Sequence, residues 1–162
     1  MNGTIQREAL ILLQHSEQAQ LGLITQAQVL GLPEVAQRYL SYAGVVGKVP
    51  IRTVRLKQQG DMRTQPGQKW LPLVAEQYFT ATPPAFLWHG TMGLFPLVSM
   101  SGTDRFTGGH GSMVIKLLSF ITVGNARGPE TDQSELQRYL AEMIWLMKVS
   151  LTMITACLRQ VS

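Results

Sequence analysis

Residues 128–146 read GPETDQSELQRYLAEMIWL, and they combine the strongest helix pattern of the chain with its main group of acidic residues. The Gly-Pro pair at the start ends the preceding segment, because proline cannot continue a strand ladder. Asp132 is the expected N-cap, and Glu135 three residues later would complete a capping box. Apolar residues then recur at helical spacing as far as Leu158. The pattern predicts a covering helix over residues 131–158.

The chain before this helix alternates between polar and apolar residues with a period of two, beginning in residues 49–63. Glycine and proline turns separate further short segments of the same kind. These segments are residues 70–81, 86–92, 97–106 (with a break at Gly102), 113–118 and 121–126. Short strands between such turns are typical of a meandering antiparallel sheet, here of about six strands over residues 49–127. We interpret Gly108-Gly109 as a tight turn within it.

Residues 1–46 show helical spacing instead of alternation, with a helix expected from Thr4 and another beginning at Pro33, where the missing N–H costs nothing. An open sheet needs its apolar face covered. We therefore expect the α+β class: a curved antiparallel sheet packed on a long C-terminal helix, with short N-terminal helices. A length of 162 residues and an apolar content of 45% fit a single domain over residues 1–162.

Several classes of function are excluded or disfavoured. Cys157 is the single cysteine, and the three histidines lack metal-ligand spacing, so no metal and no cofactor are expected. The N-terminus lacks a signal-peptide pattern, and polar residues interrupt the apolar run 143–158, which predicts a cytoplasmic chain that could still contact a membrane surface. Basic residues concentrate in 48–69 but fall largely on the polar face of an alternating strand, so nucleic acid is not an expected partner.

Two groups of polar residues are candidates for chemistry. Glu76 and Tyr78 share a strand face, and a hairpin would bring them beside Phe86 and Trp88. A carboxylate among aromatic rings can have a raised pKa and act as an acid or a base, or it can simply form a cross-strand polar pair at the sheet rim. The polar flank of the last helix is either solvated or the rim of a ligand cavity. Its residues are Glu135, Arg138, Tyr139 and Glu142.

Three motifs carry a resemblance to a known family: AEQYF at residues 75–79, PPAFLW at 83–88 and ELQRYLAE at 135–142. From Leu32 to Leu146 the chain resembles a bacterial family of uncharacterised proteins, known as a domain of unknown function. No catalytic residues are established for that family, so none is transferred. The resemblance implies a longer pattern with further strands, of which this chain would hold the N-terminal part.

The expected layout is also similar, by analogy, to bacterial lipoprotein-carrier folds, which bind acyl chains. Our first hypothesis is a protein without enzymatic activity that binds a hydrophobic or lipid-like small molecule between sheet and helix. The second is a hydrolase or isomerase that uses Glu76 with Asp104 or Glu142. The third is a structural module that forms a homodimer through a free sheet edge or an apolar helix face. The candidate ligand-binding residues are Glu76, Tyr78, Phe79, Phe86, Trp88, Met113, Arg138, Tyr139, Glu142 and Trp145.

Overall fold

The computed structural model describes residues 3–17 and 22–143. Three helices come first, then six strands and a fourth helix. In chain order they are α1 (Gly3–Glu17), α2 (Gln26–Leu30), α3 (Glu34–Tyr42), β1 (Thr53–Met62), β2 (Leu71–Thr80), β3 (Ala85–Phe95), β4 (Val98–Thr107), β5 (His110–Leu117), β6 (Ile121–Arg127) and α4 (Pro129–Met143). The strands form one antiparallel sheet in the order β1-β2-β3-β4-β5-β6, which confirms the predicted α+β class and the meander.

The hairpin between β4 and β5 shows how local sequence builds this sheet. Thr107 pairs with His110, so the loop consists of Gly108 and Gly109 alone. Both have positive φ angles, +59° and +83°, which a two-residue turn of this kind requires and glycine adopts without strain. The tight turn is therefore confirmed. The predicted break at Gly102 is wrong, because β4 runs through it without interruption.

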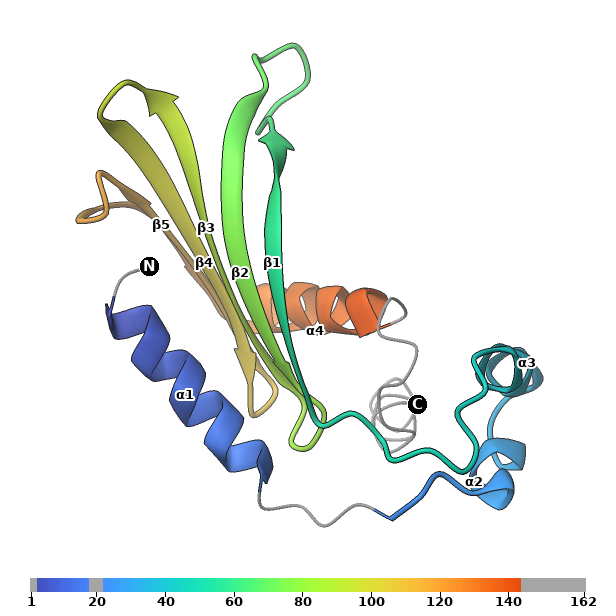
Figure 1. Cartoon of the computed structure of the whole chain (residues 1–162). Helices are drawn as coiled ribbons and strands as arrows, with labels where there is room; N and C mark the ends of the chain where they lie inside the picture. The colour runs from blue at the N-terminus through green and yellow to red at the C-terminus, as the bar shows by residue number, and fades with distance from the viewer. Residues whose placement is uncertain (1–2, 18–21, 144–162) are drawn as a thin grey trace.

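Neighbouring residues of β2 point to opposite faces of the sheet, and each face carries a helix. Phe79 packs with Tyr139 of α4, whereas Tyr78 packs with Ile5 and Ala9 of α1. Helices α1 and α4 consequently lie on opposite sides of the sheet (Figure 1). Helices α2 and α3 pack mainly on each other, and Figure 1 shows them to one side of the sheet. No helix in the described part of the chain is long and apolar enough to cross a membrane.

An aromatic core holds α4 to the sheet. Tyr139 is fully buried, and its ring centroid lies 6.2 Å from that of Phe79, 6.5 Å from that of Phe86 and 5.8 Å from that of Phe106. Such contacts add to the stabilisation from buried apolar area. The Tyr139 hydroxyl donates a hydrogen bond of 2.9 Å to the carbonyl of Thr80, so the one polar atom of this core side chain is satisfied.

The predicted N-cap of α4 is wrong. Asp132 lies inside the helix, and its amide donates to the Gly128 carbonyl at 2.9 Å. Its carboxylate instead accepts a hydrogen bond of 2.7 Å from the Gly111 amide of β5. Because β5 offers this unpaired donor, the acid ties the helix to the sheet rather than capping it. Glu135 turns toward the sheet as well, and residues 144–158 of the predicted helix lie outside the described residues.

Candidate functional site

Four charged residues meet between α4 and the sheet, and we call them the acid cluster: Asp104, Glu135, Arg138 and Glu142. Asp104 belongs to β4. It lies two residues before Phe106, which packs against α4, so both side chains are on the same face of the sheet. The other three follow one another at spacings of three and four residues, which places them on one side of α4. Arg138 donates from Nη1 to Asp104 Oδ2 at 2.5 Å and from Nε to Glu142 Oε1 at 2.8 Å.

Hydrogen bonds extend the acid cluster across the sheet to its first strand. Gln77, which is fully buried, donates from Nε2 to Glu142 Oε2. Its Oε1 accepts a bond of 3.3 Å from Gln58 Nε2, and Gln58 Oε1 accepts one of 2.8 Å from Trp88 Nε1. Both ends of each amide are thus used, so the network fixes the position of the indole relative to Glu142.

Trp88 lies flat over a slot made by two glycines. A Cβ atom placed on Gly90 would come within 2.3 Å of Trp88 Cη2, and one on Gly102 within 3.2 Å of Cζ3. Gly90 and Gly102 are register partners, which explains why a glycine interrupts the apolar pattern of β4 without breaking the strand. The Arg138 guanidinium lies 5.2 Å from the ring centroids of both Trp88 and Phe86, a distance at which cations are attracted to aromatic faces.

The Gly90→Ala variant should displace the indole, because a methyl group at this position overlaps the ring. We expect the free energy of unfolding to fall by about 1–3 kcal/mol, the usual cost of overpacking. The bond from Trp88 to Gln58 should be lost as well, which would shift the tryptophan fluorescence. Urea denaturation followed by fluorescence measures both effects. Gly60→Ala is the matched control, since a Cβ atom at Gly60 meets no atom within 4 Å; an equal loss in both variants would contradict the slot.

Burial dominates the electrostatics of the acid cluster. Glu135 is only 3% exposed, and its Oε2 has no hydrogen-bond partner within residues 3–17 and 22–143. Burial, together with the charge of Asp104, raises the pKa of Glu135 to about 7, against the opposing effect of Arg138. Burial also raises the pKa of Asp104, and the Arg138 guanidinium only partly offsets this. Three carboxylates thus share one guanidinium, and Glu135 is about half protonated near pH 7.

Glu76 and Tyr78 do not lie beside Phe86 and Trp88, so that expectation is wrong. In the hairpin register Trp88 pairs with Gln77, and a shift of one residue reverses the face of every side chain. Glu76 and Tyr78 therefore belong to the α1-side face. There the hydrogen bond from the Tyr78 hydroxyl, 2.6 Å long, is the main cause that lowers the pKa of Glu76, and Arg55 adds to it. The sheet separates Glu76 from Asp104 and Glu142.

The other predicted residues fall into three groups. Met113 is the register partner of Asp104 and lies next to the acid cluster. Phe79, Phe86 and Tyr139 belong to the packed core, and Phe79 also borders a shallow depression beside that core, while Trp145 lies outside the described residues. Sequence reasoning missed Gln58 and Gln77 as site residues. The sequence did hold one indication: Gln77 lies two residues before Phe79, so strand alternation places this polar side chain on the same apolar face.

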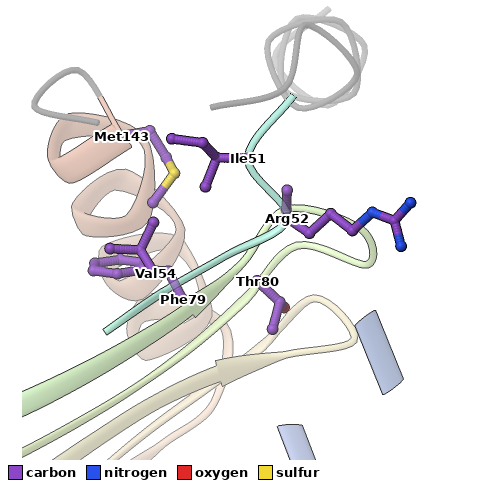
Figure 2. A pocket seen from close by; sticks show the side chains of 7 residues that line it. Ile51, Arg52, Val54, Phe79, Thr80 and Met143 are labelled. Carbon is purple, nitrogen blue, oxygen red and sulfur yellow. The ribbon is translucent and has the colours of Figure 1, made fainter. Parts of the chain in front are cut away.

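A shallow depression opens beside the core, between the end of α4 and the segment that leads into β1 (Figure 2). It holds about 140 Å³ of empty space, open solvent included, and Met143 lies beside Ile51 and Val54 on one side of it. Pockets for small molecules usually have about 300–1,000 Å³, whereas this depression encloses no space that a water molecule could occupy. Within residues 3–17 and 22–143, no three His, Cys, Asp or Glu side chains are arranged to hold a metal ion.

Apolar side chains also lie on the same face of the sheet beyond α4, where the strands extend past the helix (Figure 1). We call this region the open strip. One row of register partners crosses four strands here. It consists of Leu73, Met92, Met100 and Leu117, of which Met92 is buried and the other three are half-buried.

The fold and site define an open six-stranded antiparallel sheet with one helix on each face and a buried acid cluster under one of them. A family model matches residues 22–152, which is most of the chain. The protein therefore belongs to this family of unknown function (DUF6544), which confirms the expected resemblance to a domain of unknown function. No curated protein and no solved structure matches the chain.

Proposed function

We propose that the protein binds a hydrophobic, lipid-like small molecule along the open strip, with the acid cluster at one end of the ligand. The observation that carries the proposal is the gradient of polarity across successive rows of the sheet. The first row is the open strip itself, and the next is Ala75, Gly90, Gly102 and Ile115. The third row holds Gln77, Trp88 and Asp104, which belong to the acid cluster or its network.

This gradient suits an amphipathic ligand. Rows on one face are two residues apart, or about 7 Å, so an apolar chain about 14 Å long would span the two row spacings from the strip to the polar groups. Three of the four residues in the middle row are alanine or glycine, and the indole of Trp88 lies over the two glycines. Apolar walls with a few convergent polar groups are the usual composition of small-molecule sites. The aromatic core fills the space directly under α4, so the ligand would lie beside this helix.

The two alternatives have less support. A hydrolase or isomerase that combines Glu76 with Asp104 or Glu142 needs these carboxylates on one face, and they lie on opposite faces of the sheet. A dimerisation module could use the backbone edge of β1 or β6, the outer strands of the open sheet.

Native mass spectrometry of the purified protein distinguishes ligand binding from a dimerisation module. A bound small molecule that is removed by organic extraction supports our proposal, whereas a dimer without ligand supports the module.

Substitution on the strip gives a matched test, because Leu73 and Val74 are neighbours on opposite faces of β2. We expect Leu73→Glu to weaken binding of the neutral dye Nile red at least about tenfold, since it places a charge against the apolar probe. Val74→Glu should leave binding unchanged, because that side chain is 60% exposed on the α1-side face. Fluorescence titration measures both. Equal affinities of the two variants would show that the strip is not the site.

A further inference from the structure

The acid cluster carries more negative than positive charge. Asp104, Glu135 and Glu142 surround Arg138, so three acidic groups face one guanidinium. Arg105 also acts on Asp104, but its side chain is on the other face, paired with Glu8 of α1 at 2.8 Å. The cluster therefore has a formal charge of −2 when all three acids are ionised and −1 when one is protonated.

Glu135 gives an independent sign that the cluster is incomplete. Its Oε2 is buried with no hydrogen-bond partner in the part of the chain that the structure describes, which is rare for a carboxylate and costly when it is ionised. The charged groups that act on it are Asp104 from β4 and Arg138 and Glu142 from its own helix. From β5 it lies against the backbone of Gly111, and the neighbouring His110 is paired with Asp132. Among the described residues, Arg138 is the one positive charge that acts on Glu135, against the negative charges of Asp104 and Glu142.

We propose that the acid cluster is the head-group site for a protonated primary amine on a single alkyl chain, and that binding expels a proton from Glu135. This inference rests on the proposed function and specifies the ligand. An ammonium group supplies one positive charge and three hydrogen-bond donors, which the carboxylates of Asp104 and Glu142 can accept. A carboxylate head group would add a further negative charge to the cluster, and a hydroxyl would supply no positive charge.

The head group would approach from the outer side of the cluster, where the side chains of Arg138 and Glu142 are 28% and 29% exposed. Glu135 lies deeper and would respond through space. A positive charge nearby favours the ionised carboxylate, so the proton leaves Glu135 for the buffer as the amine arrives. No covalent bond between ligand and protein forms or breaks.

Isothermal titration calorimetry at pH 7 with three probes of equal chain length tests the head group: decylammonium and decanoate below their micellar concentrations, and decanol below its solubility limit. We expect decylammonium to bind at least about tenfold more tightly than decanoate, with decanol between them. Titration in two buffers of different ionisation enthalpy should show release of up to about half a proton per amine, because Glu135 is then about half protonated. Decanol should release none.

The outcomes separate this inference from the proposed function. Equal binding of the three probes, or tighter binding of decanoate, would refute the amine site and leave an apolar site in place. Binding of decylammonium without proton release would refute the role of Glu135. If no probe bound, the proposed function would fail, and the head-group site with it.

Two variants and a control locate the effect. Glu142→Gln should reduce the preference for the amine over decanol, and Glu135→Gln should abolish proton release while decanol still binds. Glu130→Gln removes the same charge from an exposed position in the first turn of α4 and should change neither quantity. A comparable loss of preference in Glu130→Gln would show that overall charge, and not the cluster, attracts the amine.

Discussion

Tyr139→Ala is expected to lower the free energy of unfolding by about 3–5 kcal/mol, the range for removing a buried aromatic ring from a core. Tyr139 is fully buried among Phe79, Phe86 and Phe106, so truncation leaves a cavity bounded by three rings. Urea denaturation measures the loss. Because this ring joins α4 to the sheet, we also expect the acid cluster to lose its geometry.

Tyr139→Phe is the control for this prediction, because it keeps the ring and removes the hydroxyl that donates to the Thr80 carbonyl. Its expected cost is about 1 kcal/mol, typical of one intramolecular hydrogen bond. Similar losses in the two variants would mean that the hydroxyl, and not ring packing, secures α4. A small loss in Tyr139→Ala would mean that the core closes around the missing ring.

Glu135→Gln is expected to remove a large pH-dependent penalty on stability. The pKa of Glu135 rises from an ordinary value of 4.5 to about 7 on folding, so the folded chain holds this proton more tightly than the unfolded chain. Below about pH 4.5 both states are protonated and there is no penalty. As the pH rises to 7 the unfolded state ionises first, and the stability of the native protein falls by about 3 kcal/mol, from the 1.36 kcal/mol that each pKa unit represents.

The difference in unfolding free energy between Glu135→Gln and the native chain should therefore shift by about 3 kcal/mol in favour of the variant from pH 4.5 to 8. Urea denaturation of both proteins at several pH values gives this difference. The contributions of the other titrating groups are nearly the same in both proteins and therefore largely cancel. Glu130→Gln, at an exposed position on the same helix, should show no such shift. A constant difference for Glu135→Gln would contradict a raised pKa at this residue.

Local patterns predicted most of the fold. Alternation in β2 placed Phe79 and Gln77 together on one face, and the glycines of the β4–β5 turn marked a hairpin. The register of β2 with β3 could not be predicted, because it depends on how the chain turns between them. This one-residue uncertainty in register is why Glu76 was wrongly expected beside Trp88. In the structure Gln77 takes that position, because a shift of one residue moves each side chain to the opposite face.

The role of Asp132 was also beyond prediction from local sequence. Its position three residues before Glu135 fits a capping box, and local energetics favour that arrangement. The amide of Gly111, which is 21 residues away along the chain, competes successfully for the carboxylate. Likewise, nothing near Glu135 in the sequence indicates that it faces Asp104, because that proximity arises only when α4 packs on β4 and β5.

The strand order has a consequence for how the chain folds. Every strand of the sheet pairs only with its neighbours along the chain, so each pairing closes a short loop. Low sequence separation between contacts is associated with fast folding. The sheet can therefore grow one hairpin at a time, and α1 and α4 add the distant contacts, such as that between Glu8 and Arg105. The assembly of the acid cluster would then be a late event, after β4 is in place to receive α4.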